Sequence, residues 1–250
     1  MKIEGNTVLI TGGDSGVGLA LAKALLQLNN TVIIAGRNDE KLLQVKNKFP
    51  RLHAVKCDLC QDSERKNLVS ELKNQFPELN IVINNAGVAF FSDLRDENFY
   101  ENIVKEMETN FLAPLRLAQL FSEHLRNQPY SAIVNIGSAA AFLPLTVMPG
   151  YSASKAALHS VSQSLRYQLR NTKMQVIEVL LPPVDTQMVV DFKMKKLSPD
   201  KVAAEIIKEL KEGRVFIPIG QIKILLWIYR FFPGVMGVLA NRMVSNALNK

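Results

Sequence analysis

Tyr151 and Lys155 lie four residues apart in the run YSASK, within a stretch whose apolar spacing predicts a helix. Four residues make about one helical turn, so both side chains should project from the same face. A phenol ordinarily ionises near pH ~10, and a neighbouring ammonium group lowers that pKa by stabilising the phenolate. The pair could therefore exchange protons near neutrality, although the same spacing is also found in plain surface pairs on helices.

A second candidate site follows the first apolar run, where the sequence reads TGGDSGVG just before a helical pattern. Glycines in this position let the backbone turn tightly and approach a pyrophosphate, and a helix N-terminus supplies N–H donors and positive charge. A glycine-rich turn can be a plain loop, but the strand–turn–helix context favours a dinucleotide-binding site. The residues predicted to contact the cofactor here are Gly12, Asp14, Ser15, Gly16, Val17 and Gly18.

The second apolar run, Thr31–Ala35, is followed by Arg37 and by no carboxylate that could accept the ribose hydroxyls of NAD. Arg37 could bind a 2′-phosphate through two hydrogen bonds, so the sequence favours NADP(H) over NAD(H). Asp14 is a contrary sign because it adds negative charge, and Arg37 could instead be a solvated surface residue. After the third run, Asp58 could accept a hydrogen bond from adenine or cap the next helix, and Leu59 is a further predicted contact.

The two cysteines, Cys57 and Cys60, form a C-x-x-C pair with His53 close by. Structural zinc sites usually take four nitrogen or sulfur ligands, and the sequence holds no second cysteine–histidine cluster. We therefore predict no metal site and expect the cysteines to be small residues that flank Asp58 at a strand end.

Charge is distributed unevenly over the 250 residues. Residues 1–186 hold 19 lysines and arginines against 18 acidic residues, whereas residues 187–250 hold 11 against 5. A basic tail on a nearly neutral body argues against a nucleic-acid-binding protein. The N-terminal segment shows no basic region followed by a cleavage site, so we expect a cytoplasmic protein, with contact of the tail with the inner membrane surface as an open alternative.

Seven short apolar runs, most of them separated by stretches of helical periodicity, must position these residues. The alternation predicts an α/β fold with a single Rossmann-like, doubly wound parallel sheet of about seven strands and helices on both faces. Ligands of such sheets bind at the carboxyl ends of the strands. The predicted strands are Thr7–Ile10, Thr31–Ala35, His53–Val55, Ile81–Ile83, Ala132–Ile136, Val176–Leu180 and Val215–Ile217. The predicted helices are Gly18–Leu28, Asp39–Lys48, Ser63–Gln75, Phe99–Arg126, Ser152–Asn171 and Pro199–Glu212.

Three further motifs complete a known pattern: NNAG after the fourth predicted strand, Ser138 after the fifth, and Tyr151 with Lys155. With the turn TGGDSGVG, their order and spacing resemble the short-chain dehydrogenase/reductase family over most of the chain. The runs ITGGDSGVG, AGRN and LLPPVDT look more narrowly like the DltE-like oxidoreductases, a bacterial subgroup. The resemblance implies one NAD(P)-binding domain over residues 1–250, in which residues 187–250 contribute a variable substrate loop and a basic, aromatic tail.

The resemblance implies a catalytic tetrad of Asn110, Ser138, Tyr151 and Lys155. Tyr151 would be the general acid in reduction and the base in oxidation, and Lys155 would lower its pKa and hold the nicotinamide ribose. Ser138 would polarise the substrate carbonyl. Asn110, four residues before Pro114, would hold a water that links Lys155 to solvent, and its helix would be distorted there. Taken alone, Asn110 could simply face solvent.

Two loops would complete the cofactor site. In the first, Gly87 would allow close backbone approach, Asn85 would tie neighbouring strands together, and Ala86 lies between them. In the second, the family usually has Pro-Gly after the sixth strand, whereas Pro183 in this chain removes an N–H group and stiffens the turn. The predicted contacts in that loop are Pro182, Val184 and Thr186.

The segment before Tyr151, residues 139–150, is almost wholly apolar although it must border the crevice. With Met188, Val189 and Phe192 it could form a lipophilic substrate pocket, or it could pack in the core or in a subunit contact.

The tail, residues 220–243, mixes apolar, aromatic and basic residues and is too interrupted to span a membrane. An interfacial helix, a substrate lid and an oligomer contact are all open for it. Members of the family commonly pair through the helices expected at Phe99–Arg126 and Ser152–Asn171, which implies a homodimer or homotetramer.

The leading hypothesis is an NADPH-dependent oxidoreductase that transfers hydride between the nicotinamide and a small or lipophilic carbonyl or alcohol. An NAD-dependent alcohol dehydrogenase is the alternative within the same chemistry. Outside enzymes, the alternatives are a dinucleotide sensor and a peripheral membrane protein with vestigial redox chemistry. The complete tetrad argues against the sensor.

Overall fold

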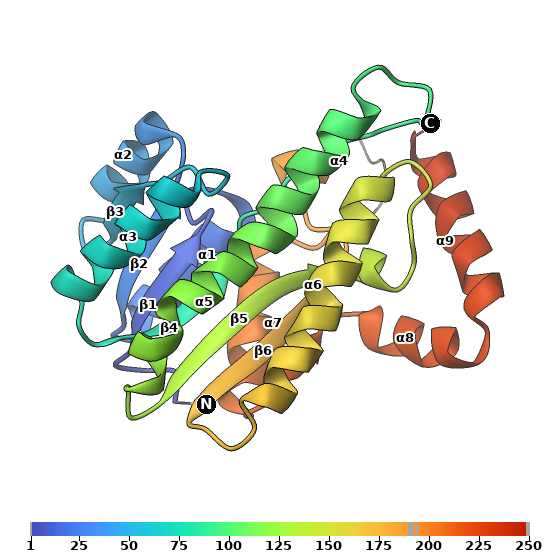
Figure 1. Ribbon diagram of the computed structural model, residues 1–250. Coiled ribbons are helices and arrows are strands. Elements are labelled where there is room, and N and C mark those ends of the chain that lie inside the picture. The colour runs from blue at the N-terminus through green and yellow to red at the C-terminus, as the bar shows by residue number, and fades with distance from the viewer. Residues whose placement is uncertain (1, 190–192, 194, 249–250) are drawn as a thin grey trace.

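A parallel sheet of seven strands forms the centre of the protein, a computed structural model of which describes residues 2–189, 193 and 195–248 (Figure 1). The strand order is β3-β2-β1-β4-β5-β6-β7. Every predicted strand overlaps an observed one, which confirms the doubly wound α/β fold. The strands are β1 Thr7–Thr11, β2 Thr31–Gly36, β3 His53–Lys56, β4 Leu79–Asn84, β5 Ser131–Ser138, β6 Met174–Leu181 and β7 Phe216–Pro218.

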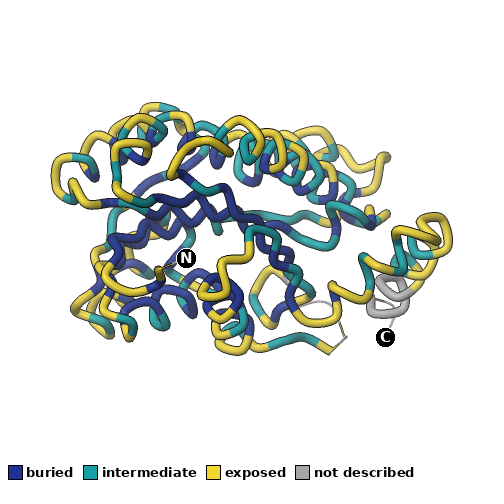
Figure 2. The backbone as a smooth tube through the Cα atoms, turned by 90° about the horizontal axis from the view of Figure 1, so that it is seen from below, coloured by how far each residue is buried: buried dark blue, intermediate teal, exposed yellow. Residues whose placement is uncertain are grey.

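Helices cover both faces of the sheet, and the buried strands lie between them (Figure 2). On one face, α1, α2 and α7 share a core with residues such as Ile34 and Ile206; on the other, α3 and α5 pack through Leu72 and Phe121 beside α6. The helices are α1 Gly16–Gln27, α2 Asp39–Lys48, α3 Asp62–Gln75, α4 Phe99–Met107, α5 Ala113–Arg126, α6 Pro149–Gln168, α7 Pro199–Lys211, α8 Ile222–Phe231 and α9 Pro233–Leu248. Two short 3-10 turns are Ala139–Ala141 and Gln187–Val189.

The long helix predicted over Phe99–Arg126 is interrupted by a π-helical turn, Glu108–Leu112, between α4 and α5. Pro114 has no N–H group to donate to the carbonyl of Asn110, and the N–H of Ala113 reaches five residues back to Glu108. The distortion predicted at Asn110 therefore takes the form of a π turn.

The winding of the sheet reverses at β1, which pairs with β2 on one side and with β4 on the other. The connections that follow β1 and β4 leave the carboxyl ends of these two strands in opposite directions, and a crevice opens between the connections. The tail forms two helices rather than one, because Pro233 begins α9 directly after α8 has ended at Phe231.

Candidate active site

A pocket of about 950 Å³ follows the carboxyl ends of strands β1 to β6. Gly18 and Asn110 do not line it, since Gly18 packs behind the glycine-rich turn and Asn110 is buried behind the pocket wall. The other residues predicted for the site all line it: Gly12, Asp14, Ser15, Gly16, Val17, Arg37, Asp58, Leu59, Asn85, Ala86, Gly87, Ser138, Tyr151, Lys155, Pro182, Val184 and Thr186.

The glycine-rich turn between β1 and α1 presents backbone to the pocket. Gly12 and Gly16 have φ angles of +62° and +52°, which a residue with a side chain adopts only with strain. Ser15 stands at the N-cap of α1 and makes no side-chain capping bond to the described residues. The first amides of α1, at Gly16 and Val17, therefore remain available to an anionic ligand, which fits the phosphates of a dinucleotide.

The carboxyl end of β2 brings cations to the pocket. Arg37 is exposed where it lines the pocket, and Lys41, from the first turn of α2, lines the same pocket. The Asp14 carboxylate lies close to Gly36, at the end of the same strand. Lys41 was not predicted; its place in the first turn of the helix that follows Arg37 was the available signal. Two cations and one anion thus surround the position expected for the adenosine ribose.

Asp58 forms a turn of its own after β3, in which its Oδ1 accepts a hydrogen bond from Cys60 N at 3.0 Å. Helix α3 begins at Asp62, so Asp58 does not cap it and the capping alternative is wrong.

The two cysteines lie on either side of Asp58. Cys60 Sγ contacts Thr109 Oγ1 at 3.3 Å, and burial raises the pKa of the Cys57 thiol to about 11. The described residues contain no group of three or more histidine, cysteine and acidic side chains placed to hold a metal ion.

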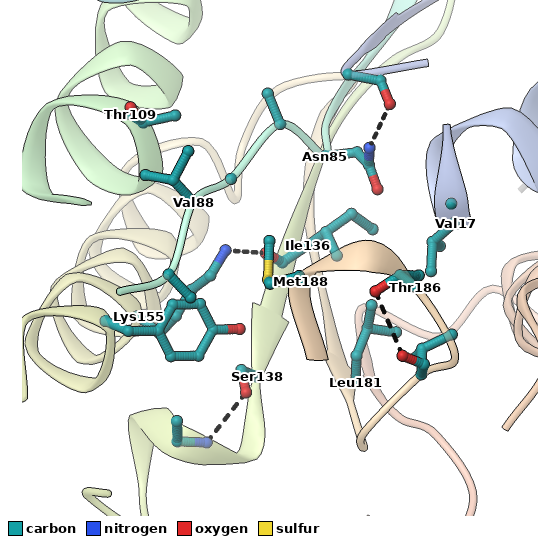
Figure 3. A pocket seen from close by; sticks show the side chains of 18 of the residues that line it. Val17, Asn85, Val88, Thr109, Ile136, Ser138, Lys155, Leu181, Thr186 and Met188 are labelled. Atoms are coloured by element: carbon teal, nitrogen blue, oxygen red, sulfur yellow. Dashed lines mark hydrogen bonds between the residues drawn. The ribbon is translucent and has the colours of Figure 1, made fainter. Parts of the chain in front are cut away.

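Asn85, after β4, ties that strand to β1. Its Nδ2 donates to the carbonyls of Thr11 and Gly12 at 2.9 and 3.1 Å, and Figure 3 draws one of these bonds. Thr11 Oγ1 accepts in return from the backbone N–H groups of Asn85 and Ala86, both at 3.0 Å. Thr11 was not predicted, although a polar residue at the carboxyl end of a buried strand was a usable signal. These bonds hold the two walls of the crevice at a set distance.

Lys155 and Ser138 reach the pocket from α6 and from the end of β5 (Figure 3). Lys155 Nζ donates to the carbonyl of Ile136 at 2.8 Å and lies 5.8 Å from the centre of the Tyr151 ring. Burial lowers the pKa of Lys155 to about 8, and attraction to Glu178 opposes part of that fall. Burial raises the pKa of Tyr151, while a hydrogen bond with Ser138 acts in the opposite direction. A buried ammonium that gives up its proton near neutrality is suited to proton exchange.

Asn110 uses its side chain to hold the loop after β4. Its Oδ1 accepts from Val88 N at 2.8 Å, and its Nδ2 donates to the Val88 carbonyl and to Ser154 Oγ at 2.8 and 3.0 Å. Both ends of this amide are hydrogen-bonded to protein groups, and the water-holding role of Asn110 stays a prediction. The Asn110 carbonyl, which Pro114 cannot reach with an N–H group, is the better acceptor for such a water.

A buried acid–imidazole pair lies next to Lys155 and was not predicted. Glu178 is fully buried on β6, and its carboxylate accepts from His159 Nδ1 at 2.8–2.9 Å. His159 lies one helical turn after Lys155 on α6. An anion in this position favours the charged form of Lys155.

Glu106 is a second buried acid, on the last turn of α4 and one turn before Asn110. Its Oε1 accepts from Phe90 N at 2.8 Å, and its Oε2 has no partner among the described residues. Burial raises the pKa of Glu106, and its negative charge raises the pKa of Tyr151. In sequence, Glu106 looks like any polar residue of a surface helix.

We expect Glu106→Gln to stabilise the protein at neutral pH, because glutamine keeps the acceptor for Phe90 and removes a buried charge. A raised carboxyl pKa means that Glu106 binds its proton more tightly in the folded state than in the unfolded state. The ionised acid therefore destabilises the fold at a pH above the folded-state pKa. Below the unfolded-state pKa the acid is protonated in both states and the effect is absent. The gain should therefore vanish below about pH 4. Urea unfolding between pH 4 and neutrality measures this gain in the free energy of unfolding. A gain that is independent of pH would contradict the prediction. Glu106→Ala is the control: it leaves Phe90 N unpaired and should destabilise the protein at every pH.

The far end of the pocket is apolar. Leu143, Leu145 and Met148 from the segment before Tyr151 line it together with Met188, while Leu225 and Met236 reach it from α8 and α9. Of the other residues expected here, the side chain of Val189 and the whole of Phe192 lie outside the described residues.

The loop after β6 is held by Pro183, whose carbonyl accepts from Leu197 N at 3.1 Å.

A family model described as short chain dehydrogenase matches residues 6–196, which is more than half of the chain. The chain belongs to the short-chain dehydrogenase/reductase family. It is thus an NAD(P)-dependent oxidoreductase with a Rossmann fold, and the family resemblance in the sequence is confirmed.

Relatives of this family refine the placement. An uncharacterised oxidoreductase of Bacillus subtilis, DltE, is 43% identical over 223 residues, which cover 86% of this chain and 88% of the relative. This places the chain with the DltE-like oxidoreductases. An uncharacterised oxidoreductase of Staphylococcus aureus is 30% identical over 82% of this chain and 91% of its own.

Two solved structures resemble the protein over nearly its whole length. A short-chain dehydrogenase of Burkholderia cenocepacia in complex with NADP has a TM-score of 0.84 and 27% identity, covering 98% of this chain and 99% of that one. A short-chain dehydrogenase/reductase of Burkholderia phymatum in complex with NAD has a TM-score of 0.82 and 20% identity, covering 96% of each chain. The second similarity concerns the fold alone.

Proposed function

We propose that this enzyme is an NADPH-dependent reductase of small or lipophilic carbonyl compounds, also able to run the reverse oxidation, with Tyr151 as its acid–base residue. The observation that carries the proposal is the meeting of Tyr151, Ser138 and Lys155 at the carboxyl end of β5, on the wall of the pocket that also holds the glycine-rich turn. The bound dinucleotide supplies the hydride. The protein supplies the proton, the orientation and the apolar surroundings.

Each of the three side chains has a distinct task. The Ser138 hydroxyl polarises and orients the carbonyl, and the Tyr151 hydroxyl donates the proton to its oxygen. Lys155, whose pKa of about 8 lies close to neutrality, returns a proton towards Tyr151. Asn110 positions the loop at Val88 and offers its carbonyl to a water on the route to solvent.

The preference for NADP(H) is supported by Arg37, just after β2, and Lys41, in the first turn of α2, which both line the pocket. Arg37→Ala should weaken binding of NADP(H) by about tenfold or more, since a charge-assisted bond to phosphate is worth about 1.5–3 kcal/mol. Binding of NAD(H), which has no 2′-phosphate, should change little. Thermal-shift titration of all four cofactor forms measures the two effects separately.

Arg51→Ala is a suitable control, because this arginine bonds the Leu26 carbonyl and does not line the pocket. Equal losses for NADP(H) and NAD(H) in Arg37→Ala would contradict the assignment. Tighter binding of NAD(H) in the wild type would favour the alternative, an NAD-dependent alcohol dehydrogenase. A panel of carbonyl compounds with the preferred cofactor then identifies the substrate class.

A homodimer or homotetramer belongs to the same proposal. Tyr100, Val104 and Leu112 are exposed along α4 and the π turn, and Tyr167 is exposed at the end of α6. These apolar side chains lie on the two helices through which family members commonly pair.

A further inference from the structure

Helices α8 and α9 form an arm beyond the last strand of the sheet (Figure 1). The inner side of this C-terminal arm, residues 222–248, closes one end of the pocket through Ile222, Leu225, Met236 and Leu239. Asn241 holds the arm to the segment before Tyr151, since its Nδ2 donates to the Pro144 carbonyl at 3.0 Å and its Oδ1 accepts from Thr146 N at 2.6 Å. The arm is therefore part of the pocket wall.

Much of the arm is exposed (Figure 2), and many of its exposed side chains are apolar. On α8, Ile224, Trp227 and Phe231 recur at helical spacing on one side, and Trp227 is 66% exposed. On α9, Val235 and Val238 follow the same spacing, and Val238 is 70% exposed. A run of apolar side chains on both helices of an arm is more than the scattered exposure of a monomer surface and marks an interaction site.

Charge on the arm has a single sign. After Glu212 the sequence contains no aspartate or glutamate. Lys223 and Arg230, two helical turns apart, flank the apolar side of α8, and Arg242 follows Val238 by one turn on α9. Lys223 pairs with Glu209 at 2.8 Å, whereas Arg230 and Arg242 form no ion pair with any residue that the structure describes. An apolar strip with aromatic residues and a basic border complements the interface of an anionic lipid bilayer.

We infer that the C-terminal arm binds the surface of a membrane rich in anionic lipid, with Trp227 and Phe231 inserted among the acyl chains. No helix in the described part of the chain is long and apolar enough to cross a membrane, so the arm lies in the interface. A second copy is the less suitable occupant, because a twofold contact would bring Arg230 and Arg242 of each arm towards those of the other. Membrane binding sets the apolar end of the pocket beside the bilayer.

The experiment uses Trp227, the single tryptophan of the chain. In full-length protein, its emission should shift to the blue with phosphatidylglycerol vesicles and be quenched by brominated acyl chains, with little change for phosphatidylcholine vesicles. Binding should weaken as salt rises. Arg230→Glu alone, and combined with Phe231→Ser, should lower the partition coefficient by about tenfold or more, since each basic residue contributes near an anionic surface.

Leu43→Ser with Lys46→Glu is the matched control, because it too replaces an exposed apolar residue by serine and reverses a basic charge, but on α2, at the opposite edge of the sheet. It should bind vesicles as the wild type does. The inference is overturned if emission is unchanged with all vesicles, or if both lipids bind equally. A third outcome also overturns it: without lipid, the Trp227 emission shifts to the blue as protein concentration rises, and light scattering shows that the protein self-associates. A second copy would then be the occupant of the apolar surface. These readouts require no turnover and are independent of the proposed activity.

Discussion

Tyr151→Phe is expected to lower kcat for carbonyl reduction by about 10²–10⁴-fold, the range that a positioned acid–base group contributes. The variant loses the hydroxyl that meets Ser138 and keeps the ring that packs 5.8 Å from Lys155 Nζ. The pocket wall is otherwise unchanged, so the Kd for NADPH should stay close to the wild-type value. Steady-state kinetics give kcat, and thermal-shift titration gives the affinity for the cofactor.

Tyr130→Phe serves as the control, because the Tyr130 hydroxyl bonds Gln175 Oε1 at 3.3 Å just before β5 begins, away from the pocket. Its kcat should equal that of the wild type. A Tyr151→Phe variant that retained a rate within about tenfold of the wild type would sink the proton-transfer role, because removal of an acid–base group costs more than that. A loss of cofactor affinity equal to the loss of rate would instead indicate a binding role.

Gly18→Ala is expected to destabilise the fold and to weaken dinucleotide binding together. An added Cβ would lie 2.3 Å from the carbonyl oxygen of Gly12 and 2.5 Å from Asn85 Nδ2. The first of these is backbone, so α1 must move away from the turn, at a cost of about 1–3 kcal/mol. Such a loss lowers the Tm by several degrees in a chain of this size. The same movement breaks the Asn85 bonds that set the width of the crevice, so the Kd for NADPH rises.

Gly237→Ala is the paired control, since a Cβ there meets nothing within 4 Å. Alanine is the better helix former, and this variant should gain about 0.5–1 kcal/mol. Urea unfolding and thermal-shift titration of both variants separate the close approach at Gly18 from the general effect of replacing a glycine in a helix. Unchanged stability and affinity in Gly18→Ala would show that α1 and the turn have room to spare.

Much of the site was predictable because its signals are local. The turn after β1 can be read from its glycines and from the helix that follows, and Tyr151 and Lys155 from one helical turn. Arg37 stands at the end of an apolar run, which in a parallel sheet is the ligand-binding edge. Periods of two and of three to four residues are properties of a segment by itself and need no knowledge of its neighbours.

Burial of charge could not be predicted in the same way. Glutamate is usually a surface residue, so nothing in the sequence marks Glu106 and Glu178 as buried. Only the packing shows that Glu106 lies against Gly150 and Glu178 beside Lys155. Their effect on the pKa values of Tyr151 and Lys155 depends on distance and desolvation, which no spacing in the sequence encodes. The capping alternative at Asp58 was wrong for a related reason: a side chain bonds the nearest free N–H, and the loop places that of Cys60 closest.

The sequence by itself determined the family of this protein and its candidate reacting groups, since the order of strands and helices and the residue types at their ends are sufficient to specify both. The tertiary structure alone decided the environment of those groups: which acids are desolvated, that the Asn110 side chain is engaged with Val88, and that the tail is both a wall of the pocket and an exposed apolar surface. The physical reason is that covalent order sets local geometry, whereas solvation and charge interaction arise from contacts between segments far apart in the chain.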